Sequence, residues 1–401
     1  MTLPWIEIKV VFLLGIALLS YRVEGARRGL VGADATVFDV TTYGAKPDGK
    51  TNNAMMFIRA WNAACQSTGP AKLVIPPGNF MAGEVFFHGP CKCSDPITVE
   101  VLGTVLGHTD LSEYTSGLWI GFNKIDGLVV TGTGTFNGQG EASWKFNDRT
   151  HKTLLPISLK FQFVQNALVE KINLVNSKGF HMTVTSCNNF KLEGLDITAP
   201  GNSPNTDGIH ISRSDLVNVT NSVIGTGDDC ISMGEGNSNI RVSGITCGPG
   251  HGISVGSLGH PLDKDVKGIR VTNCTLKGTT NGARIKTLEK SNQMKASNII
   301  FEDITMTDVK NPIIIDQHYN SKNKQGSSKV KISDIHFRNI RGSSISDVAV
   351  SLDCSNANPC EGVELVDIDL TYSGTCSCSL SAACSNAKAI FTGKQSPVAC
   401  A

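Results

Sequence analysis

Residues 190–197 read Phe-Lys-Leu-Glu-Gly-Leu-Asp-Ile, with apolar side chains at Phe190, Leu192, Leu195 and Ile197. The steps of two residues are the alternation of a strand with one buried face, and the step of three marks a bend between two strands. The same spacing recurs in seven more segments, which begin at Ala167, Val217, Ile240, Ile269, Ile299, Ile335 and Val363.

The third apolar positions of these segments lie 23 to 36 residues apart, and helical periodicity is nearly absent. A coil of this length with two or three short strands, stacked by parallel pairing, is a parallel β-helix. The alternative all-β repeat, a β-propeller, has longer repeats of about 40 to 50 residues. Weaker copies at Ile97-Val99 and Leu128-Val130 place the first coils before residue 100. The sequence therefore predicts a single all-β solenoid.

An open stack of strands needs its ends covered. The helical-looking stretch Asn53–Cys65 is predicted to cap the N-terminal end, and the cysteine-rich tail Cys376–Cys400 is predicted to close the other.

The first residues predict export from the cell. Residues 1–25 hold the apolar run Val10–Leu19, about half the ~20 residues of a spanning helix, and Val23 and Gly25 suit cleavage after Gly25. A signal anchor is the alternative. No later stretch is apolar enough to span a bilayer, so we expect residues 26–401 to be a soluble extracellular domain without membrane contact.

In an extracellular protein, the cysteines are expected to form disulfides and two asparagines can be glycosylated. Thirteen cysteines are then mostly disulfides, with at least one left over. The tripeptides that start at Asn218 and Asn273 are candidate glycosylation sites.

Composition excludes some partners. Charged residues make up 18% of the chain, 41 residues are glycine, and the net charge is +1. A nucleic-acid binder would need a broad basic surface, so a polyanionic partner here would have to meet a few local cations.

Polar side chains recur at the start of strands between the repeats. Asp207, Asp229 and His251 occupy the same position of their segments and are 22 residues apart each time, with Asp228 just before Asp229. One coil further along a β-helix is one strand over, about 4.8 Å. The spacing therefore predicts a column of these three side chains.

The neighbouring face carries glycines and cations. Aligned by alternation, one position is predicted to hold Gly208, Cys230, Gly252 and Arg284, and the next His210, Ser232, Ser254 and Lys286. Glycine leaves room for a bulky ligand to approach the backbone.

Three clustered carboxylates repel one another, which raises at least one pKa and divides the group into acid and base. Inverting glycoside hydrolysis needs such a pair. Arg284 and Lys286 are predicted to bind a substrate carboxylate, and His251 to tune the acid or contact a sugar. Single aspartates at corners often only cap turns, and a calcium site is a further use of such clusters, which the two cations disfavour.

Four ordered segments carry a family resemblance: Asn205-Thr206-Asp207, Gly227-Asp228-Asp229, Gly250-His251-Gly252 and Arg284-Ile285-Lys286. They resemble the signature segments of the polygalacturonases, glycoside hydrolase family 28. The start Phe38–Gly49 is similar to that of plant members, and the chain is most similar to pollen-type exopolygalacturonases.

The resemblance implies a right-handed parallel β-helix that hydrolyses homogalacturonan (pectin) with inversion. It implies Asp228 as proton donor, Asp207 and Asp229 as the groups that position and deprotonate water, and His251 as their support. Arg284, Lys286 and Tyr319 would bind substrate, and His210 on the same face is a further predicted contact. The resemblance also implies two disulfides, Cys230 with Cys247 and Cys354 with Cys360.

The remaining expectations are a secreted, monomeric cell-wall enzyme that needs no cofactor or metal. Pollen-type similarity implies exo action, with endo action as the alternative. Other candidates are a hydrolase of decorated galacturonan or rhamnogalacturonan, a calcium-dependent lyase on the same solenoid, and a non-catalytic wall-binding or allergenic protein.

Overall fold

The computed structural model describes residues 35–400 apart from 94, 148–154, 322, 324, 325 and 376. Residues Thr36–Ala401 form one compact unit. The predicted signal peptide at 1–25 and the predicted domain start at 26 lie outside the described residues.

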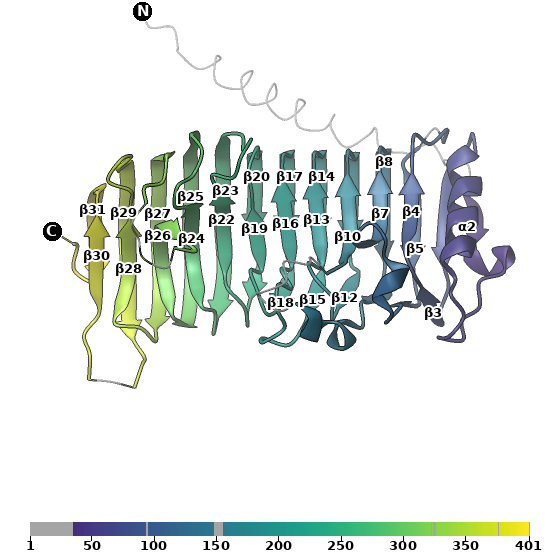
Figure 1. Ribbon diagram of the computed structural model, residues 1–401, viewed down its shortest axis with the longest axis horizontal. Helices are drawn as coiled ribbons and strands as arrows, with labels where there is room; N and C mark the ends of the chain where they lie inside the picture. The colour runs from purple at the N-terminus through teal and green to yellow at the C-terminus, as the bar shows by residue number, and fades with distance from the viewer. Residues whose placement is uncertain are drawn as a thin grey trace, which may run out of the picture. The chain divides into compact units, whose positions relative to one another are not determined.

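The described chain folds into a right-handed parallel β-helix, as predicted. Figure 1 shows the strands of successive coils side by side along the unit. One face is an eleven-stranded sheet made of β4 (Val85–His88), β7 (Leu118–Asn123), β10 (Ile157–Gln162), β13 (Met182–Thr185), β16 (Ile209–Ser212), β19 (Ile231–Met233), β22 (Ile253–Leu258), β24 (Asn281–Leu288), β26 (Asn311–Tyr319), β28 (Val348–Asp353) and β30 (Ser381–Ser385).

A twenty-stranded sheet forms the other faces. One of its ladders contains β1 (Thr36–Asp39), β2 (Ala71–Ile75), β5 (Ile97–Val101), β8 (Asp126–Gly132), β11 (Gln165–Glu170), β14 (Asn188–Glu193), β17 (Asp215–Thr220), β20 (Ser238–Ser243), β23 (Val266–Lys277), β25 (Met294–Val309), β27 (Val330–Ser344), β29 (Cys360–Tyr372) and β31 (Ala387–Ser396). The second contains β3 (Asn79–Ala82), β6 (Thr104–Gly107), β9 (Thr135–Asn137), β12 (Asn173–Val175), β15 (Asp196–Thr198), β18 (Val223–Gly225) and β21 (Thr246–Cys247).

The step of three residues is a corner between these two ladders, as the repeat predicted. The residue just before the third apolar position has a positive φ in coil after coil: Lys171 (56°), Gly194 (61°), Asn221 (50°), Gly244 (66°), Asn273 (52°), Asp303 (56°), Asn339 (47°) and Asp367 (54°). Glycine, asparagine and aspartate tolerate this left-handed conformation better than other residues. The sequence places them there because the chain must turn.

The interior is a stack of like side chains. Ile209, Ile231 and Ile253 lie opposite one another on β16, β19 and β22 and are fully buried. Aromatic rings also stack, with centroids 4.9 Å apart for Phe122 and Phe161. Burial of each such side chain stabilises the fold by about 1.5–3 kcal/mol.

The predicted helical cap is present as α2 (Ala54–Gln66), beside the first coils. Its buried face includes Phe57 and Trp61, and the Trp61 ring stacks on Phe87 of β4 at 4.8 Å. The other helices are the short η1 (Val40–Tyr43), η2 (Leu111–Glu113), η3 (Gly140–Ala142) and η4 (Trp144–Phe146). None of the helices in the described ranges is both long and apolar enough to cross a membrane.

The cysteine-rich tail differs from the prediction. Its described residues supply β30 and β31, which pair with β28 and β29 and so add a last coil to the stack. No residue of β31 is buried, and the strand extends the ladder beside β29, so in this part of the chain the tail continues the sheets and does not lie across their end.

Four disulfides tie the described chain: Cys65–Cys91, Cys230–Cys247, Cys354–Cys360 and Cys384–Cys400. The two predicted pairs are confirmed. Among the described cysteines, Cys93, Cys187 and Cys274 form no disulfide.

Candidate active site

The predicted column starts from the register of four neighbouring strands, β16, β19, β22 and β24. Backbone bonds from Gly208 N to Asp229 O and from Cys230 N to Gly252 O, both 2.9 Å, put Asp207, Asp229 and His251 at the same level of successive coils. The predicted alignment of these three residues is confirmed, and they stand two residues before the first residues of the central strands β16, β19 and β22.

The predicted level of Arg284 is wrong by two residues. Arg284 lies opposite Ser254, and Ala283 lies opposite Ile253, so Gly282 and not Arg284 follows Gly252 in the row. A shift of two residues keeps the same side chains inside, which is why alternation in the sequence could not detect it. The cations therefore stand further along the strands than expected.

Asp229 is the fixed centre of the cluster. Its side chain is fully buried, and Lys286 Nζ lies 2.7 Å from Asp229 Oδ2. Arg284 Nη2 lies 2.6 Å from Oδ1, which also accepts a bond of 3.0 Å from Ser254 Oγ. The two cations predicted to bind a substrate carboxylate thus already bind a carboxylate of the protein.

Asp207 is buried, and one hydrogen bond from a serine is what its carboxyl receives in place of water. Its Oδ2 accepts a hydrogen bond of 2.9 Å from Ser232 Oγ, and only 5% of the residue is exposed. Burial, followed by the charges of Asp228 and Asp229, raises the pKa of Asp207 well above its usual value. In the free protein, Asp207 therefore holds its proton more tightly than an aspartate in water does.

His210 lies on the same face, in register with Ser232, and its Nδ1 is 2.8 Å from Ser232 Oγ. Burial and the charge of Lys286 lower the pKa of His210 to about 4. The ring is therefore neutral well above pH 4 and acts there as a hydrogen-bonding group.

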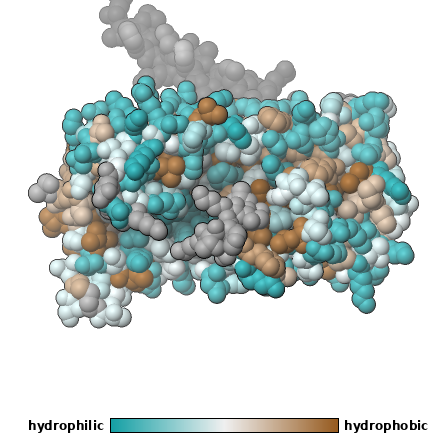
Figure 2. Space-filling model, viewed as in Figure 1, coloured by the Kyte–Doolittle hydropathy of each residue, from teal (hydrophilic) through white to brown (hydrophobic). Residues whose placement is uncertain are grey.

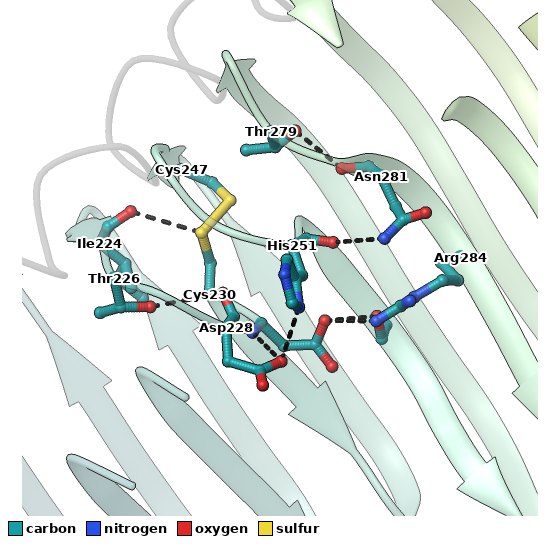
Figure 3. The surroundings of a disulfide bond; sticks show 11 residues. Ile224, Thr226, Asp228, Cys230, Cys247, His251, Thr279, Asn281 and Arg284 are labelled. Atoms are coloured by element: carbon teal, nitrogen blue, oxygen red, sulfur yellow. Dashed lines mark hydrogen bonds and ion pairs between the residues drawn. A yellow bond between two sulfur atoms is a disulfide. The ribbon is translucent and has the colours of Figure 1, made fainter. Parts of the chain in front are cut away.

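Asp228 is the accessible carboxyl. Its side chain is 25% exposed, and its Oδ1 lies 2.9 Å from Nδ1 of His251, which is 40% exposed. Figure 3 shows the two side chains pointing toward each other. Burial raises the pKa of Asp228, but the hydrogen bond and charge of His251 and the charge of Lys286 outweigh it, so the pKa lies below the usual value.

A disulfide and two hydrogen bonds hold the backbone around Asp228. The Cys230–Cys247 disulfide joins the strand after Asp228 to the next coil (Figure 3). His251 N donates to Asp228 O at 2.8 Å, and Asp229 N donates to Asp228 Oδ1 at 2.8 Å. These bonds orient the Asp228 side chain on a rigid element.

Tyr319, at the end of β26, lies against the cation pair. The centroid of its ring is 5.0 Å from Lys286 Nζ and 5.9 Å from Arg284 Cζ. A ring face at this distance attracts both charges, so Tyr319 belongs to the cluster, and its contact with substrate stays a prediction. Figure 2 shows a hydrophilic hollow over the middle of this face.

Two site residues were missed as functional candidates. Ser232 and Ser254 were predicted to lie on this face, but they also connect the cluster: Ser232 links His210 to Asp207, and Ser254 links Arg284 to Asp229. Their signal was available, because both stand three residues after a position of the acidic column.

The same side chains fit a cation site less well than they fit a hydrolytic site. One ligand atom each from Asp228, Asp229 and His251 lies within 4.8 Å of the others. Calcium takes six to eight oxygen ligands, whereas both oxygens of Asp229 already accept bonds from Arg284 and Lys286.

An accessible carboxyl beside two buried ones is the equipment of glycosidic-bond hydrolysis, which defines the class as a glycoside hydrolase. The model of the glycosyl hydrolases family 28 matches residues 65–400, and the chain belongs to this family.

Similar proteins and solved structures are consistent with membership of this family. The chain is 47% identical over 386 residues to "Exopolygalacturonase clone GBGE184" of Arabidopsis thaliana, covering 93% of this chain and 90% of that one. It is 44% identical to an exopolygalacturonase of Platanus acerifolia, covering 92% and 98%. An exopolygalacturonase structure from Thermotoga maritima is similar in fold, with a TM-score of 0.75 at 17% identity over 89% of this chain and 90% of that one.

Proposed function

We propose that the protein is a secreted exopolygalacturonase that removes galacturonate units from the ends of homogalacturonan with inversion. The observation that carries the proposal is the division of labour among the carboxyls: Asp228 faces solvent, while Asp229 and Asp207 are buried beside it. The printed names of relatives at 44–47% identity support the substrate and the exo mode.

Asp228 is the proton donor in this scheme, since of the three carboxyls it has the most exposed side chain. In the free protein its pKa is low. A bound sugar would bury Asp228 and bring a further carboxylate, and both effects raise the pKa of Asp228 toward that of a general acid.

Asp229 and Asp207 position and deprotonate the attacking water in this scheme, and Asp207, whose pKa is raised, must lose its own proton before it can accept one from the water. Arg284 and Lys286 bind Asp229 and so fix the orientation of its carboxylate, which supports its role in positioning the water. Because general-acid catalysis needs a protonated donor, we expect the rate to fall as the pH rises through the pKa of Asp228 in the complex, which gives an acidic optimum.

Arg284, Lys286, Tyr319 and His210 form the contact surface for the sugar at the cleaved bond. Arg284 donates hydrogen bonds from Nε to Ser254 and from Nη2 to Asp229. A guanidinium has five N–H donors. Donors therefore remain for the substrate carboxylate while Asp229 stays paired.

Secretion is supported by four disulfides, because such bonds persist in oxidising compartments. Asn273 is exposed at a corner and offers an accessible glycosylation site, whereas Asn218 is half-buried on β17. The resemblance to pollen-type members supports a cell-wall enzyme of pollen, acting as a monomer on pectin, and its exposure on pollen would make it a potential allergen.

The test follows oligogalacturonides of defined length by chromatography, with wild-type protein, Asp228→Asn and the control Asp196→Asn. Asp196 is an exposed aspartate on β15. We expect monomer from the first time points, a loss of about 10³-fold or more in kcat for Asp228→Asn, and no loss for the control.

Mixed mid-length products would replace exo by endo action. An unsaturated product that depends on calcium would indicate a lyase. Absence of cleavage by the wild-type protein would overturn the hydrolase proposal for this substrate and favour a wall-binding protein.

A further inference from the structure

A cavity of about 540 Å³ lies where β25 and β27 begin. Its lining includes Lys295, Lys329 and Lys331, together with Asp265 and Asn358. β25 starts six residues after the end of β24, the strand that carries Arg284 and Lys286. The cavity therefore belongs to the same coils as the active site but uses none of its residues.

Two of its lysines stand opposite each other. Lys295 and Lys331 are partners in the β25–β27 ladder, and both are exposed between buried neighbours. Like charges directly opposite on adjacent strands are destabilising. The repulsion between Lys295 and Lys331 therefore destabilises the fold locally. An anion bound in the cavity would remove this repulsion.

Nearby carboxylates neutralise this charge only in part. Asp265 accepts a bond of 2.7 Å from the backbone N of Lys295, and Glu361 lies 3.4 Å from Lys331 Nζ but is shared with Lys388 at 3.3 Å. Within the described ranges, no carboxylate lies within ion-pair distance of Lys295 or Lys329. The cavity therefore has an excess of positive charge in a protein whose net charge is only +1.

We propose that this cavity is an exosite for the carboxylates of a galacturonan chain, separate from the active site. This inference rests on the proposed function, which supplies the polyanionic substrate. Lysines one strand apart present a row of charges, which fits successive carboxylates of a polymer better than one small anion. A polymer held here raises the local concentration of chain near the catalytic hollow.

The experiment compares Lys295→Gln/Lys331→Gln with the wild type and with Lys191→Gln/Lys277→Gln. The control removes the same charge from exposed positions on β14 and β23. kcat/KM is measured on polygalacturonate and on digalacturonate, at low and at high salt. We expect the cavity variant to lose about tenfold on the polymer at low salt, to lose little at high salt, and to be unchanged on digalacturonate.

Equal polymer rates for the cavity and control variants would overturn the exosite. An equal loss on both substrates, with a lower Tm, would also overturn it, because the change would then be structural. Inorganic phosphate at constant ionic strength should lower the wild-type polymer rate toward that of the cavity variant, because it competes with the polymer for the lysines, and it should leave the cavity variant unchanged. An equal effect of phosphate on both proteins would overturn the exosite.

Failure of the proposed function can be recognised separately, as absence of cleavage of either substrate by the wild type. In that case co-sedimentation with insoluble pectate still tests the cavity. Weaker sedimentation of the cavity variant than of the control would support the binding site without any catalysis, and equal sedimentation would overturn it.

Discussion

Asp229 is a fully buried charge whose place depends on two cations, Arg284 and Lys286. Removing one partner of a buried ion pair is more destabilising than replacing the whole pair, because the remaining charge is uncompensated. We expect Lys286→Met to lower the free energy of unfolding by about 2–3 kcal/mol in urea denaturation. Adding Asp229→Asn should recover much of this loss, and an additive loss in the double variant would contradict the coupling. Lys277→Met, on the surface, is the control.

Asp207 makes a second prediction, on pH dependence. Its pKa in the folded protein lies well above 3.8, the value for a free side chain. The folded state therefore binds this proton more tightly than the unfolded state, so the free energy of unfolding falls as pH rises from about 4 through the folded pKa. Asp207→Asn removes that loss.

We expect Asp207→Asn to raise Tm by roughly 2 °C at pH 7 and by little at pH 4, while it abolishes hydrolysis. Thermal denaturation at the two pH values measures this difference. A gain of the same size at both would show that ionisation of Asp207 is not its cause.

At this scale the sequence predicted which residues meet but not how they pair. The 22-residue spacing placed Asp207, Asp229 and His251 at one level. It could not show that Arg284 and Lys286 bind Asp229, because that pairing depends on a register that differs from the alternative by two residues and leaves the buried pattern unchanged.

At the scale of elements, the corners decide the fold. Most of the corner residues with positive φ are asparagine, aspartate or glycine, but Lys171 adopts 56°. A side chain with a Cβ is strained in this conformation by about 1 kcal/mol. Lys171→Gly should therefore raise the free energy of unfolding by about 0.5–1 kcal/mol.

The matched control is Lys191→Gly, in the middle of β14, where glycine weakens a strand. Chemical denaturation should show opposite signs for the two variants. Destabilisation by both would mean that the Lys171 side chain contributes more than its strained backbone costs.

Elements with a strong local pattern were predicted well. The repeated +2, +3, +2 spacing located the corners, and the cap predicted over Asn53–Cys65 is a helix over Ala54–Gln66. The tail was less predictable, because cysteine density shows that chain segments are tied together but does not show whether they cover the end of a sheet or extend it.

At the scale of the whole molecule, the two ends of the stack differ. The first coils are covered by α2, whereas the last described coil is formed by β30 and β31, and no residue of β31 is buried. In a solenoid each coil is stabilised chiefly by its neighbours. The Cys384–Cys400 disulfide ties this last coil to the chain end.

We expect Cys384→Ser/Cys400→Ser to speed amide exchange in β30 and β31 and to leave kcat on oligogalacturonides unchanged, because local opening at an end need not reach the central coils. Hydrogen exchange read by mass spectrometry measures the first effect. Faster exchange in β16 and β19 as well would show that the stack opens as one unit.

The loops that connect the ladders to the eleven-stranded sheet also determine how this protein can change over generations. The repeats range from 23 to 36 residues in length, yet the strands that follow Asp207, Asp229 and His251 stay in register. Insertions are therefore absorbed at the loops, outside the ladders. New loop sequences around the hollow can be acquired and selected for substrate preference without moving the aspartates, so the chemistry can be inherited while the specificity diverges.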